Sequence, residues 1–132
     1  MSVESDIPEF PGEEPVGWIT CRHRPWDGVL VRAGRIPFAA GDEVAFDVTV
    51  CGDVDGRIPA AMVRGVVSVT ADTTAVDYTI PWDGVLDAVV EGSITVSYSL
   101  APAGGGGPAV SESAVVRYSR RGPGGAVCGP ES

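Results

Sequence analysis

Three residue types are missing from this sequence, because it contains no lysine, no asparagine and no glutamine. All nine basic residues are therefore arginines, against eighteen Asp and Glu, and the formal net charge is -9. Such a surface repels phosphate backbones, so we expect no nucleic-acid partner. Lysines commonly guard exposed strand edges, and their absence leaves any edge strand here with fewer charges that oppose pairing.

Long apolar runs are also missing. No stretch approaches the roughly 18–20 apolar residues that a membrane helix needs, so we expect no membrane insertion. Residues 1–18 show neither the positive region nor the apolar core of a secretion signal, which predicts a protein that folds where it is made or reaches the outside as cargo of a larger assembly.

Residues that commonly hold metals are few and poorly spaced. The single histidine, His23, lies two positions after Cys21, but the other cysteines are distant and no C-x2-C pair occurs, so a zinc site is disfavoured. Asp53 and Asp55 match a fragment of a calcium loop, but the glutamate expected downstream is missing. We predict no metal and no cofactor.

Cysteine usage leaves one question open. Cys21, Cys51 and Cys128 are an odd number and widely spaced, so at most one disulfide can form within the chain. Without an export signal free thiols are the favoured state, although one pair remains an alternative.

Catalytic signatures are likewise missing. No G-x-S-x-G element occurs, and a serine-type triad would have to recruit His23. The glycine run 104–107 leads into a predicted strand rather than a helix, so it is not a phosphate-binding loop. No two of the eighteen carboxylates stand out as a glycosidase pair. We expect that the chain is not an enzyme.

What the sequence does contain is alternation with a period of two. In residues 43–51 Val44, Phe46, Val48 and Val50 share one face, and residues 93–100 alternate in the same way. Predicted strands cover 16–22, 28–33, 43–51, 62–70, 75–80, 93–100 and 112–118. Gly84 and Gly92 confine a possible helical turn to residues 85–90.

The expected fold follows from this pattern. Because no long amphipathic helix is available to cover a sheet, two sheets must cover each other. We predict an all-β protein, an immunoglobulin-like two-sheet antiparallel sandwich of about seven strands over residues 16–119. An extended, acidic, proline-rich arm (1–15) precedes it, and a flexible tail rich in glycine and proline (120–132) follows.

Candidate partner-binding residues lie in the arm, among the tryptophans and near the C-terminus. The hexapeptide Pro-Trp-Asp-Gly-Val-Leu occurs at 25–30 and at 81–86, where an Asp-Gly turn with a capping Trp is the plainer interpretation and a paired aromatic surface the alternative. The arm offers two apolar anchors for a neighbouring subunit, and the arginines could clamp acidic groups. The candidates are Ile7, Phe10, Trp18, Trp26, Trp82, Arg117, Arg120 and Arg121.

From Gly34 to Tyr118 the order of motifs resembles bacterial and phage immunoglobulin-like β-sandwich modules. The matching pieces are residues 36–44 leading into a long alternating strand, 78–81, 92–98, and the final Ser-x-Ser…Val-Arg-Tyr strand. The resemblance implies a structural or binding role, since such modules serve as spacers in adhesins or as decorations on virions.

The leading functional hypothesis is a non-catalytic virion accessory, a phage capsid or tail decoration protein assembled in the host cytoplasm. Its expected partners are capsid or tail subunits and copies of itself. The alternative is a bacterial cell-surface or secreted module for adhesion or carbohydrate binding that uses the three tryptophans.

Overall fold

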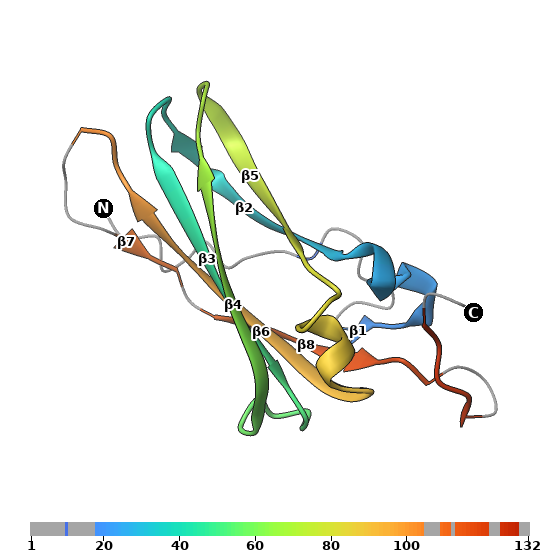
Figure 1. The fold of residues 1–132 in the computed structure, drawn as a ribbon. Helices are drawn as coiled ribbons and strands as arrows, with labels where there is room; N and C mark the ends of the chain where they lie inside the picture. The colour runs from blue at the N-terminus through green and yellow to red at the C-terminus, as the bar shows by residue number, and fades with distance from the viewer. Residues whose placement is uncertain (1–9, 11–17, 105–108, 112, 122–124, 130–132) are drawn as a thin grey trace.

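The structure, a computed structural model, describes residues 10, 18–104, 109–111, 113–121 and 125–129 (Figure 1). The predicted all-β class is confirmed. The strands are β1 (Trp18–Ile19), β2 (Val29–Phe38), β3 (Glu43–Cys51), β4 (Pro59–Ser68), β5 (Thr73–Ile80), β6 (Glu91–Ala101), β7 (Ala109–Val110) and β8 (Ala114–Ser119). Three short 3-10 helices complete the described elements: η1 (Cys21–His23), η2 (Pro25–Asp27) and η3 (Leu86–Ala88).

Strand bounds agree best where the alternation is cleanest. The predicted strand 43–51 coincides with β3, and the predicted turn at 85–90 contains η3. The prediction of a strand at 16–22 is wrong beyond Ile19, because the chain turns into η1. There the backbone N–H of Thr20 donates to Nδ1 of His23 (2.9 Å), and Arg24 adopts a left-handed conformation with φ 48°.

Two sheets form the two layers. The larger sheet has the order β1-β8-β6-β3-β4, and β7 pairs with β6 beyond Ala114, the first residue of β8. The smaller sheet is the antiparallel pair β2-β5, which Figure 1 shows as a separate layer. One pair departs from the expected antiparallel pattern, since β1 runs parallel to β8.

The core lies between these layers. The inward face of β3 contributes Val44, Phe46, Val48 and Val50, all at most 1% exposed, as the alternation predicts. Tyr78 of β5 stacks on Phe46, with the ring centroids 5.5 Å apart. A Cβ at Gly65 of β4 would collide with the Tyr78 ring, so the missing side chain lets β4 and β5 approach each other.

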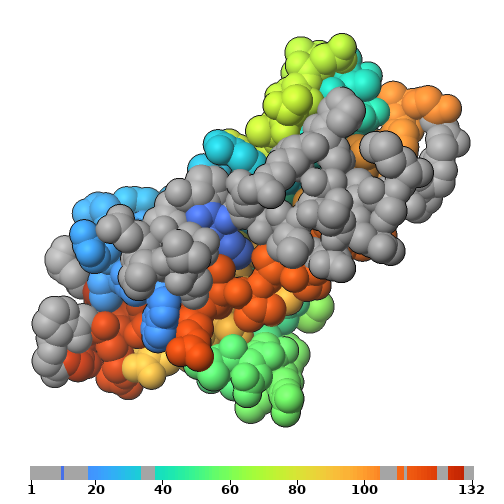
Figure 2. Space-filling view, turned by 180° about the vertical axis from the view of Figure 1, so that it is seen from behind, coloured from blue at the N-terminus to red at the C-terminus, as the bar shows by residue number. Residues whose placement is uncertain are grey.

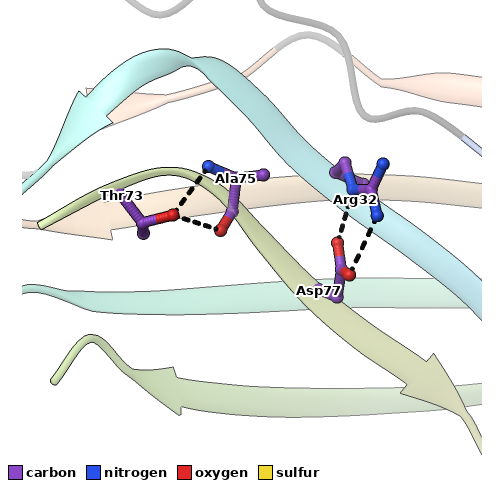
Figure 3. Close-up of polar contacts among 4 residues, drawn as sticks. All are labelled: Arg32, Thr73, Ala75 and Asp77. Carbon is purple, nitrogen blue, oxygen red and sulfur yellow. Dashed lines mark hydrogen bonds and ion pairs between the residues drawn. The ribbon is translucent and has the colours of Figure 1, made fainter. Parts of the chain in front are cut away.

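Outside the core, a bidentate ion pair joins the two strands of the smaller sheet. Nε of Arg32 lies 2.7 Å from Oδ1 of Asp77, and its Nη2 donates to Oδ2 at 3.1 Å (Figure 3). Both side chains are well exposed, so we assign this pair to strand register more than to stability.

Asp42 joins two loops at one end of the sandwich. Its carboxylate accepts the backbone N–H of Ala39 (2.9 Å) and that of Ala103 (2.8 Å), which links the β2–β3 turn to the connection after β6. These two donors, with that of Ala103 the stronger influence, lower the pKa of Asp42 below its usual value.

A disulfide closes the opposite end of the fold. Cys21 in η1 is bonded to Cys128, with the Cα atoms 6.0 Å apart and the residues separated by 107 positions in sequence. The expectation of free thiols is therefore wrong for this pair, while Cys51 stays a buried thiol. Residues 125–129, assigned above to a flexible tail, are anchored: Val127 bridges Arg121, and the Cys128 N–H donates to the Arg120 carbonyl at 2.7 Å.

Removing this disulfide should destabilise the fold. A crosslink that closes a loop of about 100 residues contributes on the order of 4–5 kcal/mol. We therefore expect dithiothreitol, or the double substitution Cys21→Ala/Cys128→Ala, to lower the free energy of unfolding in urea by about that amount. The double variant should not respond further to reductant, and an unchanged urea midpoint on reduction would contradict the assignment.

Asp42 should make stability depend on acid. Because its folded pKa is lowered, its contribution is complete above the unfolded pKa of about 3.9 and is lost as pH falls through the folded value. We expect Asp42→Asn to be less stable than the wild type at pH 6 and to lose less stability between pH 4 and pH 2. Asp83→Asn, at an exposed carboxylate, is the control for charge removal, and identical pH profiles for all three proteins would refute the role.

Candidate protein-binding surface

The structure describes one of the two predicted arm anchors. Ile7 lies outside the described residues. Phe10 is 4% exposed and belongs to the hydrophobic core cluster, so its assignment as an anchor for a neighbouring subunit is corrected. Its ring is buried within its own chain, where it removes apolar surface from water.

The two Pro-Trp-Asp-Gly-Val-Leu copies come together in space. Val29 at the start of β2 pairs with Ile80 at the end of β5, so the turns that precede and follow these residues lie at the same end of the smaller sheet. Consistently, η2 contacts η3. The repeat by itself did not predict that the two hexapeptide copies would be neighbours, because only the antiparallel pairing of β2 with β5 places them side by side.

Each tryptophan lies against an arginine, and the paired aromatic binding surface stays a prediction. The guanidinium carbons lie 5.3 Å from the Trp18 ring (Arg117), 5.3 Å from the Trp26 ring (Arg24) and 4.9 Å from the Trp82 ring (Arg120). Such stacking contributes about 0.5–1 kcal/mol at exposed sites and more where water is excluded.

Arg120 makes hydrogen bonds within its own chain and is not exposed to a partner. The residue is 8% exposed, and its Nε donates to the carbonyl of Val89 at 3.0 Å. Its Nη1 donates to the Cys128 carbonyl (3.1 Å) and its Nη2 to that of Asp87 (3.4 Å). The guanidinium thus holds the η3 turn and the C-terminal segment together, which corrects its assignment as a partner-binding residue.

Tyr118 strengthens the same region from within the core. Its hydroxyl donates to the carbonyl of Leu86 at 2.8 Å, and burial raises the pKa of Tyr118 above its usual range. The phenol therefore stays neutral and keeps its proton for this bond.

Arg117 and Arg121 remain at the surface. Nε of Arg121 lies 2.6 Å from a carboxylate oxygen of Glu91, and its Nη1 donates to the carbonyl of Gly125. Arg117 is exposed on β8 beside Trp18. Their role in binding a partner stays a prediction.

Three of the candidate metal ligands make a disulfide or hydrogen bonds within the fold. Cys21 and Cys128 are bonded to each other, so the formal zinc set does not exist in this state. The Asp53 carboxylate accepts the backbone N–H groups of Ile58 (2.8 Å) and Arg57 (2.9 Å), and the Ile58 donor is the main cause of its lowered pKa. Within the described ranges no group of three or more His, Cys, Asp or Glu could hold a metal ion, and no helix is long and apolar enough to span a membrane.

The outward face of the larger sheet carries exposed apolar side chains that the sequence predictions missed. We name this surface the outer face and define it by two cross-strand rows. The first row runs Met62, Thr49, Thr95, Val115, and the second runs Val66, Ala45, Ser99, Val110. The four apolar residues at the row ends are 50–74% exposed: Met62 74%, Val66 57%, Val110 59% and Val115 50%.

Between these rows lies a neutralised pair of charges. Arg64 of β4 is opposite Asp47 of β3, with Nη1 3.2 Å from Oδ1, and Ser97 follows on β6. A shallow depression of about 150 Å³ lies here between β3 and β4. The outer face is therefore nearly uncharged in a chain of net charge -9, and its centre consists of small side chains.

A signal for this surface was present in β4. Met62-Val63 and Val66-Val67 are consecutive apolar pairs, and a strand cannot turn both members of such a pair inward. Val63 and Val67 are half-buried against the core, so Met62 and Val66 face outward. The pairs identify an apolar outer residue but not its neighbours on the other strands.

Comparisons with known proteins returned no relative. No family model matches the chain, and neither a curated protein nor a solved structure does.

Proposed function

We propose that this chain is an immunoglobulin-like, non-catalytic accessory module that binds a protein surface through its outer face. The strand order supports the fold. In immunoglobulin domains one sheet contains the third, sixth and seventh strands, with an extra strand beside the third in variable-type domains, and the second and fifth strands pair in the other sheet. Here β8-β6-β3-β4 and β2-β5 have the same relationships.

The observation that carries the binding role is the exposure of four large apolar side chains on one face of the larger sheet. Scattered surface valines are ordinary, but these residues end two rows on the same side of the sheet, with the row of Arg64, Asp47 and Ser97 between them. The inner positions of these two rows are Thr, Ser and Ala, whose small side chains allow another surface to approach closely. A nearly neutral face also removes the repulsion that the acidic remainder of the chain would exert on an acidic partner.

The disulfide bears on where the module works. Disulfides persist on virion and cell surfaces and in other oxidising environments, and they are rare in the reducing cytoplasm. We therefore propose a role on the exterior of a protein assembly, with a phage virion, through its capsid or tail subunits, as the leading setting. A bacterial cell surface is the alternative, and Cys21–Cys128 is equally consistent with it.

Val115→Asp should abolish attachment while the fold is kept. Val115 is 50% exposed on the outer face, and a buried carboxylate there would be desolvated without a partner. In the organism that encodes the chain, we expect the wild type in the sedimenting particle fraction and at least about a tenfold loss of the variant from it. Quantitative immunoblots of particle, envelope and soluble fractions measure this.

Val127→Asp is the matched control, since Val127 is 48% exposed but lies outside the outer face. It should sediment like the wild type, and circular dichroism should show both variants folded. Recovery in the envelope fraction would favour the cell-surface setting. A wild type confined to the soluble fraction, or a Val115→Asp variant that sediments normally, would overturn the proposal.

A further inference from the structure

The larger sheet has one long open edge. β4 pairs with β3 on one side, and on its other side no strand among the described residues pairs with it. The opposite edge is β1, which is two residues long before the chain turns into η1. β4 has ten residues, so alternate backbone N–H and C=O groups along it face outward and can accept another strand.

The devices that usually protect such an edge are scarce in β4. Its only charged side chain is Arg64, which lies 3.2 Å from Asp47 of its own chain. Pro59 occupies the first position, and the only irregularity in its pairing with β3 lies at that same end, between Val50 and Cys51. Along the remaining strand, Met62 and Val66 are the exposed apolar residues beside the edge.

Gly65 keeps this edge in place. The ring of Tyr78 fills the space that a side chain at Gly65 would take, and the ring itself stacks on Phe46 in the core. The inner face of β4 is thereby packed against β5 while its outer edge stays open. The edge is preorganised, which lowers the entropic cost of adding a strand.

We infer that β4 pairs in antiparallel fashion with β4 of a second copy, which joins two large sheets into one. A strand that pairs with itself about a two-fold axis gives a closed dimer, because each copy offers one such edge in this sheet. Charge supports a second copy as the occupant: a net charge of -9 opposes close approach elsewhere, whereas the β4 edge with its Arg64–Asp47 pair is neutral.

The charge on Arg64 also limits the register. A two-fold axis at Arg64 would place two guanidinium groups opposite each other, which is unfavourable. An axis at Val63 instead places Met62 opposite Arg64 of the second copy, where the aliphatic part of the arginine covers the thioether. The same register brings Ala60 opposite Val66, so no like charges meet across the pair.

The joined sheet deepens the proposed function, on which this consequence rests. The two-fold axis of an in-plane strand pair is perpendicular to the sheet, so both outer faces point to the same side. A dimer would therefore present two binding surfaces to one lattice. Such bivalent attachment strengthens binding by effective concentration without any new contact.

The test is the mass of the purified full-length, disulfide-intact chain by sedimentation velocity from about 1 to 200 μM. We expect a monomer–dimer equilibrium that Met62→Lys/Val66→Lys shifts to monomer, with at least a tenfold higher dissociation constant. Val115→Lys is the matched control, because Val115 lies on the outer face like Met62 and Val66 but belongs to β8, an internal strand of the sheet. It should dimerise like the wild type. Raising NaCl from 50 to 500 mM should strengthen the dimer, since salt screens the repulsion between two acidic chains.

Hydrogen exchange gives the second measurement. Amides of β4 that do not pair with β3 should gain protection as the protein concentration rises, and the double lysine variant should lack this gain. A monomer at 200 μM, or a dimer that both variants leave intact, would overturn the inference. A dimer disrupted by Val115→Lys as strongly as by the double variant would also overturn it, by showing face-to-face packing. Attachment to particles is measured in the separate sedimentation experiment with Val115→Asp. A chain that binds particles as a monomer would therefore refute the dimer but not the proposed function.

Discussion

The fold depends on one geometric constraint, the mismatch in width between its two layers. Two paired strands are about 10 Å wide, whereas the five strands across the larger sheet span about 24 Å. β2 and β5 alone therefore cannot cover the inward face of that sheet. The remaining core is completed by residues outside both sheets, and these include Phe10, Leu86 and Val89, all at most 9% exposed. A residue near the N-terminus and a short turn after β5 belong to the core because they cover the part of the larger sheet that β2 and β5 leave uncovered.

The same constraint explains the hydrogen bonds and the disulfide that hold one end of the molecule together. The η3 turn has to remain packed although no strand holds it, and Arg120 and Tyr118 bond to its carbonyl groups or to those beside it. The Cys21–Cys128 disulfide and the Cys128 carbonyl on Arg120 then bring the C-terminal segment to the same place. A buried guanidinium is stable here because carbonyl oxygens and the Trp82 ring surround it. Side chains that suggested external contacts in the sequence thus hold the interior together.

Since the inward faces are committed to the core, we propose the outward face of the larger sheet as the surface for a partner. Two of its four apolar row ends, Met62 and Val66, belong to β4 and therefore lie beside the open edge of that strand. In the two proposals above, β4 serves self-association, while β7 and β8 serve attachment through Val110 and Val115. The two roles can be separated by substitution because the strands lie at different positions in the sheet.

The sequence alone determined the all-β class, the inward faces of β3 and β6 and the short helical turn after β5, because alternation and glycine act locally. It did not determine the disulfide, the burial of Phe10 or the internal role of Arg120, since each depends on contacts between segments far apart in the chain. The outer face belongs to this second group. Its rows combine residues of β4, β3, β6 and β8, and only the pairing register brings Met62 into line with Val115. Local pattern chose which side chains turn inward, and long-range strand pairing decided which outward side chains meet.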